Sequence, residues 1–107
     1  MRAQLLALFA AAGILNGCTS PYVAPAGADG EDIFRDACLR CHAAVTNGGD
    51  GTTEVYFTLA EDEMNPQYIA GRIQSGTIGM PRFPYITGPE LEALAGFVLS
   101  RSTLEAN

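Results

Sequence analysis

Two cysteines three residues apart, with a histidine directly after the second, constrain this chain more than any other feature: Cys38-Leu39-Arg40-Cys41-His42. Residues i and i+3 of a helical turn face the same side, so both sulfurs can reach one edge of a flat ligand. This spacing is the attachment signature of c-type haem. It predicts two thioether bonds, from Cys38 and Cys41, and one iron ligand, from His42.

Two other interpretations of this pentapeptide are weaker. A redox-active Cys-x-x-Cys pair usually lies between a strand and a helix, whereas the residues before Cys38 read as helix. A structural zinc ion needs four nitrogen or sulfur ligands. Outside the pentapeptide the chain offers only Cys18, because His42 is its single histidine.

The length and charge of the chain limit its size and its partners. Its 107 residues predict one small domain, whose core is marginal unless a covalently held haem fills the centre. Its formal net charge is −6, with 6 basic residues against 12 acidic ones. This balance argues against a nucleic-acid partner. It favours redox partner proteins with a basic docking patch.

Residues 1–17 are predicted to be a targeting segment rather than part of the fold. Arg2 precedes an apolar run that ends near Leu15 and is too short for a permanent membrane span. Export to the periplasm is therefore expected, and c-type haem is attached outside the cytoplasm in bacteria.

The odd cysteine, Cys18, closes this segment in Leu15-Asn16-Gly17-Cys18. This tetrapeptide resembles the bacterial lipobox, apart from Asn16, and predicts lipidation of Cys18 and tethering to a membrane. The alternative is ordinary cleavage near Ala24-Pro25-Ala26. Residues 18–28 are small and rich in proline, and they read as a flexible tether.

Three helices are expected after the tether. The first opens at Asp29, an N-cap residue, and delivers Cys38 and His42 from its last turn. The second opens at Asn65-Pro66, a cap followed by proline. The third opens with Thr87-Gly88-Pro89-Glu90, which has the form of a capping box.

The connections between these helices are less regular. Residues 43–51 contain Asn47-Gly48-Gly49-Asp50-Gly51 and predict a tight loop. Residues 52–59 could form a strand. Because a strand would have no partner, we expect an extended or partly helical stretch, with Val55 and Phe57 lining the haem pocket. Residues 100–107 are expected to fray.

Met80 is the candidate for the second iron ligand. It lies in Gly76-Thr77-Ile78-Gly79-Met80-Pro81-Arg82-Phe83-Pro84, a stretch stiffened by proline, and no second histidine competes for the iron. A lone methionine usually fills gaps in a core, but an open haem face makes the ligand role the better interpretation. Met64 is the competitor, within an acidic run that we expect to be solvated.

Together these residues resemble the class I cytochromes c. The pentapeptide is the most specific match, and Met80-Pro81-Arg82-Phe83 is similar to the Met-Pro-x-Phe loop of the family. Gly30 and Phe34 precede Cys38 as in the family's first helix, and Phe97 matches the aromatic of its last helix. The resemblance covers about residues 29–100, and it implies that the domain expected over residues 29–107 has an all-α fold, with three to four helices around one haem c and its iron. It also implies that Gly30 lets the terminal helices approach closely.

One departure from the family concerns the partner of His42. The family often has Gly-Pro shortly after the histidine, whereas no proline occurs here before Pro66. The partner of the imidazole is therefore not assigned. Tyr56, Arg72 and Tyr85 are candidates for contacts to the haem carboxylates.

The expected function is one-electron transfer with no catalysed reaction. A His/Met-ligated iron has both axial positions filled, so no substrate binds, and a methionine ligand raises the reduction potential. Two alternatives stay open. A haem sensor or gas-binding module requires Met80 to detach. A fixed cytochrome subunit of a membrane-bound oxidoreductase would use the same chemistry with a permanent partner.

Overall fold

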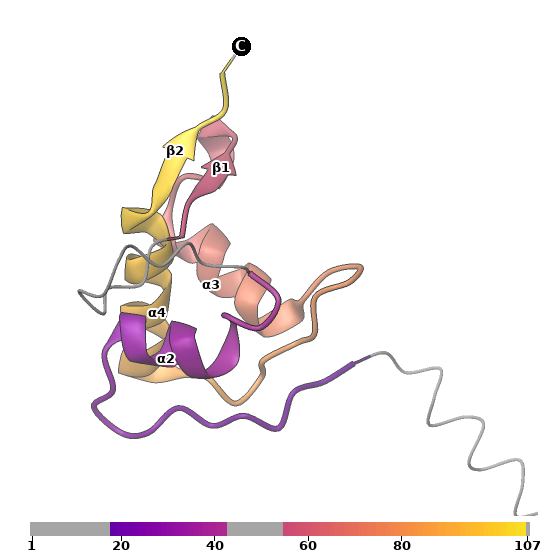
Figure 1. Cartoon of the computed structure of the whole chain (residues 1–107), viewed down its shortest axis with the longest axis vertical. Helices are drawn as coiled ribbons and strands as arrows, with labels where there is room; N and C mark the ends of the chain where they lie inside the picture. Colours follow the sequence, from indigo (N-terminus) through magenta and orange to yellow (C-terminus); the bar gives the residue numbers. More distant parts are fainter. Residues whose placement is uncertain (1–17, 43–54, 107) are drawn as a thin grey trace, which may run out of the picture.

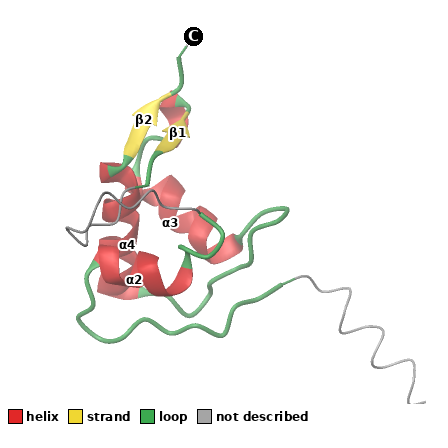
Figure 2. Cartoon of the chain, viewed as in Figure 1, coloured by secondary structure: helices red, strands yellow, loops and turns green. Residues whose placement is uncertain are grey.

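The computed structural model of the chain describes residues 18–42 and 55–106 (Figure 1). Three α-helices dominate these residues (Figure 2), together with one 3-10 turn and two short strands. In chain order the elements are α2 Gly30–Ala37, β1 Phe57–Leu59, η1 Glu61–Glu63, α3 Pro66–Ser75, α4 Gly88–Ser100 and β2 Ser102–Leu104. No helix among the described residues is both long enough and apolar enough to cross a membrane.

The helices begin at the three predicted positions. The Asp29 side chain accepts a hydrogen bond from the backbone N–H of Asp32 at 2.8 Å. Asn65 accepts one from Tyr68 N–H at 2.7 Å. Each bond satisfies a backbone donor that the first helical turn leaves without a partner. The third cap differs from the prediction, because the Thr87 side chain makes no capping hydrogen bond in this helix. Pro89 in the first turn of α4 is favourable without it.

Helices α2 and α4 pack tightly at Gly30. A Cβ atom built on Gly30 would overlap the carbonyl oxygen of Ala93 and lie 2.7 Å from Cβ of Phe97. Only glycine permits this approach, as the family resemblance implied. One turn further along α2, the rings of Phe34 and Phe97 lie 5.4 Å apart.

The buried core lies among the three helices. Phe34, Ile33, Ile86 and Leu94 have less than 2 % of their surface exposed. The other buried apolar residues are Ala37, Val55, Ile69, Ile73, Phe83 and Ala95. The three helices and this single core confirm the predicted all-α class.

A small parallel sheet corrects two predictions. Strands β1 and β2 pair in parallel, with Phe57 opposite Ser102 and Leu59 opposite Leu104. The stretch expected to be extended or partly helical is therefore a strand over 57–59, and residues 102–104 do not fray. Both predictions failed because the partner strand lies at the far end of the chain.

The start of the described chain also differs from the flexible tether predicted for residues 18–28. The backbone N–H of Ser20 donates to the carbonyl of Arg82 at 2.8 Å, and Arg82 N–H donates to the carbonyl of Cys18 at 3.1 Å. Tyr22, Ala24 and Ala28 are partly buried against the core. These contacts hold the segment along the domain.

Candidate functional site

The pentapeptide forms a turn directly after α2. The helix ends at Ala37, and Cys38 is its C-cap. Backbone N–H groups of Cys41 and His42 both donate to the carbonyl of Cys38, at 3.1 and 3.0 Å. The motif therefore follows the helix instead of occupying its last turn, which corrects that prediction. The turn still brings the residues around one carbonyl, because its hydrogen bonds continue the helical pattern.

The two thiols differ in their surroundings. Cys38 is half-buried and Cys41 is exposed, and neither forms a disulfide among the described residues. Burial, with a smaller contribution from Cys41, raises the pKa of the Cys38 thiol to about 11. A reactive dithiol of the thioredoxin type needs the opposite shift, a lowered thiol pKa. The environment of Cys38 is therefore unlike that of a redox-active thiolate.

Aromatic rings flank His42. The imidazole lies 5.4 Å from the ring of Phe57, at an interplanar angle of 60°. It lies 6.2 Å from the ring of Phe34. Phe34 and Phe57 contact each other edge to face at 6.1 Å. The sequence left the surroundings of His42 unassigned, and these two rings limit the orientations open to the imidazole.

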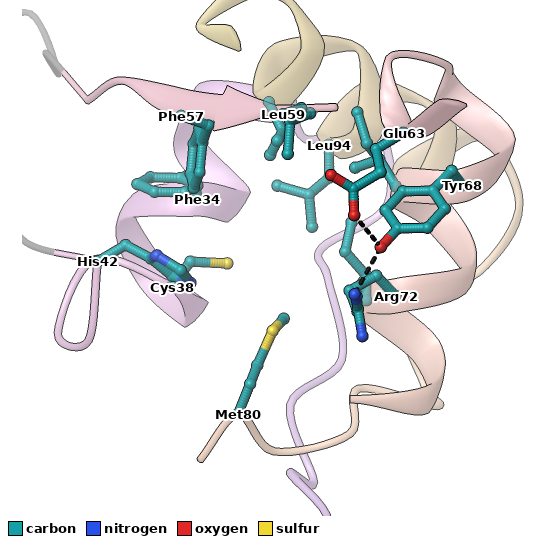
Figure 3. A pocket seen from close by; sticks show the side chains of 13 residues that line it. Phe34, Cys38, His42, Phe57, Leu59, Glu63, Tyr68, Arg72, Met80 and Leu94 are labelled. Atoms are coloured by element: carbon teal, nitrogen blue, oxygen red, sulfur yellow. Dashed lines mark hydrogen bonds between the residues drawn. The ribbon is translucent and has the colours of Figure 1, made fainter. Parts of the chain in front are cut away.

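Two cavities meet at the predicted ligands. One has a volume of about 180 Å³ and lies among the three helices and β1. The other, of about 780 Å³, opens toward the start of the described chain. Cys38, His42 and Met80 line both of them. Figure 3 shows His42 and Cys38 on one side of the first cavity, with Met80 rising from the 76–82 segment below it.

The wall of the first cavity is mostly apolar. It consists of Phe34, Phe57, Leu59, Ile69, Ile73, Leu94 and Val98, drawn from α2, β1, α3 and α4. Such a wall suits a flat, largely apolar macrocycle. A thioether, an imidazole and a thiol at the same cavity are the donor types that haem c requires. The residues present therefore fit this group.

One side of this cavity is polar, at Glu63, Tyr68 and Arg72 (Figure 3). The Tyr68 hydroxyl donates to Glu63 at 2.7 Å and accepts from Arg72 at 2.5 Å. The other carboxylate oxygen of Glu63 accepts from the Ala60 N–H at 2.8 Å. The Ala60 and Tyr68 hydrogen bonds lower the pKa of Glu63, and the bond to Glu63 raises the pKa of Tyr68.

Met80 lies on a loop of residues 76–83, here called the Met80 loop. Thr77 and Met80 exchange backbone hydrogen bonds at 3.1 and 3.0 Å, and Phe83 N–H donates to the Ile73 carbonyl at 3.0 Å. Gly76 has φ +66°, and a Cβ there would lie 2.7 Å from the Met80 carbonyl oxygen. Glycine at this position therefore permits the turn that presents Met80.

The remaining candidate residues divide into those at the cavities and those elsewhere. Phe57 and Arg72 line the first cavity, and Cys18 lines the second. Val55 belongs to the core. Met64 and the exposed Tyr56 and Tyr85 are absent from the described walls of both. Residues 43–51, predicted to be a loop, and residues 1–17, predicted to be a targeting segment, lie outside the described residues.

Among the polar residues that line the first cavity, sequence reasoning missed Glu63 and Tyr68. Tyr68 and Arg72 stand four positions apart on α3, so they share a helix face. That spacing was a usable signal once Arg72 had been singled out. Glu63 gave no such signal, because its bond to Tyr68 depends on how η1 joins α3.

Comparison with known proteins agrees with this site. Residues 25–98 match the family described as "Cytochrome C oxidase, cbb3-type, subunit III". The chain is also 31% identical over 75 residues to cytochrome c6 of Cyanidium caldarium, covering 68% of this chain and 69% of that protein. No solved structure gives a significant match.

The chain therefore belongs to the small class I c-type cytochromes. As a member of this family it carries covalently bound haem c with iron, and it transfers electrons rather than acting as an enzyme. Its partners are redox proteins.

Proposed function

We propose that this cytochrome is a one-electron carrier with His/Met ligation. In this assignment Cys38 and Cys41 hold the haem through thioether bonds, His42 is one axial ligand and Met80 is the other. The observation that carries the proposal is that Cys38, His42 and Met80, from two distant parts of the sequence, line both cavities.

The bound haem supplies a ferric/ferrous couple. The protein tunes that couple through its ligands and its walls. A thioether from Met80 favours the ferrous form, and the buried Phe34 and Leu94 keep water away from this side. Phe34 and Phe57 hold the His42 ring from two directions. The chain thus binds the haem, orients the His42 ring and shields this side of the site from water.

We also propose that the protein is exported and held at a membrane. Residues 1–17 read as a leader, and acylation of Cys18 would supply the anchor. Cys18 is exposed in the structure, which leaves its side chain accessible for modification. The net charge of −6 favours a partner with a basic docking patch.

A visible spectrum and the mass of the exported protein test these assignments together. The expected protein has one haem, an acylated Cys18 and a low-spin spectrum that carbon monoxide does not change. Rapid binding of carbon monoxide to the reduced protein would instead identify a sensor or gas-binding module. A colourless protein, made in a host with the haem attachment machinery, would refute the haem assignment.

A fixed subunit of a membrane oxidoreductase is the second candidate. The family match favours it, because its description names a subunit of an oxidase. Purification in mild detergent separates the two candidates. A carrier elutes alone, whereas a subunit elutes in stoichiometric amounts with its complex.

A further inference from the structure

The first three described residues, 18–20, bind to the Met80 loop, and we call them the N-terminal clasp. Cys18 and Ser20 exchange backbone hydrogen bonds with Arg82, at 3.1 and 2.8 Å. Thr19 and Arg82 therefore form a parallel bridge. Arg82 is only two residues from Met80, so the clasp is attached beside the proposed iron ligand.

The clasp fixes where an acyl anchor would leave the domain. Cys18 is exposed, and it lines the second cavity together with Cys41, Ile78 and Met80. Consecutive Cα atoms are only 3.8 Å apart. Because the carbonyl of Cys18 itself is bonded to Arg82, no length of free chain separates the proposed acylation site from the Met80 loop.

The surface around this point suits an anionic bilayer. Ile78 is the most exposed large apolar residue of the described chain, and nothing in that part of the chain covers it. The exposed Arg40 lines the second cavity with Ile78, and the exposed Arg82 follows Ile78 by four residues in the Met80 loop, in a protein of net charge −6. One acid, Asp36, lines the same cavity, and the Tyr22 hydroxyl lies 3.4 Å from its carboxylate. The acidic turn η1 lies beyond α3 with β1 and β2, away from the clasp (Figure 1).

From these contacts we infer that the acylated protein lies with the clasp and the Met80 loop against the lipid headgroups, with Ile78 in the interface. The inference rests on the proposed lipidation of Cys18. Arginines attract anionic headgroups, and an apolar side chain strengthens an acyl anchor. A redox partner that approaches this face must then itself be a membrane protein.

A single new thiol tests the orientation. Ile78→Cys is introduced into the full chain, where acylation blocks Cys18 and haem blocks Cys38 and Cys41. The holoprotein is bound to vesicles of phosphatidylglycerol and phosphatidylethanolamine, and its rate of reaction with a membrane-impermeant maleimide is measured. The reference is the same domain in solution, with Cys18→Ser. The matched control is Leu104→Cys, exposed on β2 at the other end.

We expect the Ile78→Cys thiol to react about tenfold more slowly on vesicles than in solution, and the Leu104→Cys thiol to react equally fast in both. Equal rates on vesicles and in solution at both positions would mean that the clasp opens and the domain swings on a free tether. Equal slowing at both positions would mean that no face is preferred. Either result overturns the inference.

The same samples separate this inference from the proposed electron-transfer role. Protein that does not float with the vesicles lacks the anchor, which overturns the orientation. Its visible spectrum still reports His/Met ligation. A high-spin spectrum in protein that floats and shows slow labelling at position 78 would refute Met80 as a ligand and leave the orientation standing.

Discussion

Different interactions stabilise the two halves of the first cavity. The half from α2 and α4 is apolar and close-packed, with Phe34 and Leu94 almost fully buried and Gly30 against Ala93. The half from α3 and the Met80 loop also buries Ile69, Ile73 and Phe83, but residues 76–82 of the loop include no buried residue, and backbone hydrogen bonds hold them. Burial thus stabilises the side of Cys38 and His42, whereas hydrogen bonds and loop geometry stabilise residues 76–82, the segment that carries Met80.

This contrast has a physical consequence. Burying a large apolar side chain contributes about 1.5–3 kcal/mol, whereas a typical hydrogen bond contributes about 0.5–1.5 kcal/mol net. We therefore expect residues 76–82, the segment that carries Met80, to open first under stress. The half from α2 and α4, beside Cys38 and His42, should remain folded until the domain unfolds as a whole.

Met80→Ala should have the largest effect, because it removes the proposed iron ligand from the segment that burial does not stabilise. The iron should become open to carbon monoxide. The potential should fall on the order of 0.1 V or more, since axial ligands set haem potentials over roughly 0.8 V. Visible spectra measure the binding of carbon monoxide, and a redox titration measures the potential. Met64→Ala is the control, since Met64 lies outside the described cavity walls. An unchanged spectrum in the Met80→Ala variant would exclude Met80 as an iron ligand.

Gly30→Ala tests the close-packed half. The new methyl group would meet the Ala93 carbonyl and Phe97, and overpacking of this kind destabilises by about 1–3 kcal/mol. Guanidinium unfolding of the holoprotein measures the loss. Gly96→Ala is the matched control on α4, because a Cβ there meets nothing within 4 Å. That variant should be more stable by about 0.5–1 kcal/mol. Equal losses in the two variants would contradict this packing.

Glu63→Gln probes the polar side and should have the smallest effect. Hydrogen bonds from Ala60 and Tyr68 hold the pKa of Glu63 below its usual value. The unfolded chain titrates near the ordinary value, about 4.3. Glu63 therefore contributes stability above that pH, and the contribution disappears as the pH falls through the lower folded pKa.

Unfolding at pH 7 and at about pH 3, below the usual glutamate pKa, measures this contribution. The wild-type protein should exceed Glu63→Gln in stability at the higher pH, and the difference should shrink at the lower one. Glu61→Gln removes a charge from the same 3-10 turn and serves as the control. A difference that grows on acidification would show that the Glu63 hydrogen bonds do not favour the charged carboxylate.

Local signals made much of this molecule predictable. Asp29 and Asn65 cap helices where the sequence placed them, because an N-cap bond spans only three residues. Met80 was singled out by glycine and proline around it, and it does lie at the same cavity as His42. Gly30 followed from the family resemblance.

Contacts between distant segments escaped the sequence analysis. The β1–β2 pair joins strands of three residues each, separated by two helices. Strands so short show no alternation that identifies a partner. The clasp depends on backbone bonds to Arg82, which residue types other than proline can also make. The polar side of the first cavity depends on η1, which places Glu63 next to Tyr68. Composition does not encode that geometry.

The pairing of β1 with β2 matters for anyone who engineers this protein. Phe57 lies beside the His42 imidazole, pairs with Ser102 in the sheet, and accepts a hydrogen bond on its backbone carbonyl from the Thr103 hydroxyl at 3.4 Å. Replacing the tail from Ser102 onward with a purification tag would therefore loosen a ring that steadies the imidazole. A tag appended after the last residue, Asn107, leaves the strand pairing intact and is the safer construction.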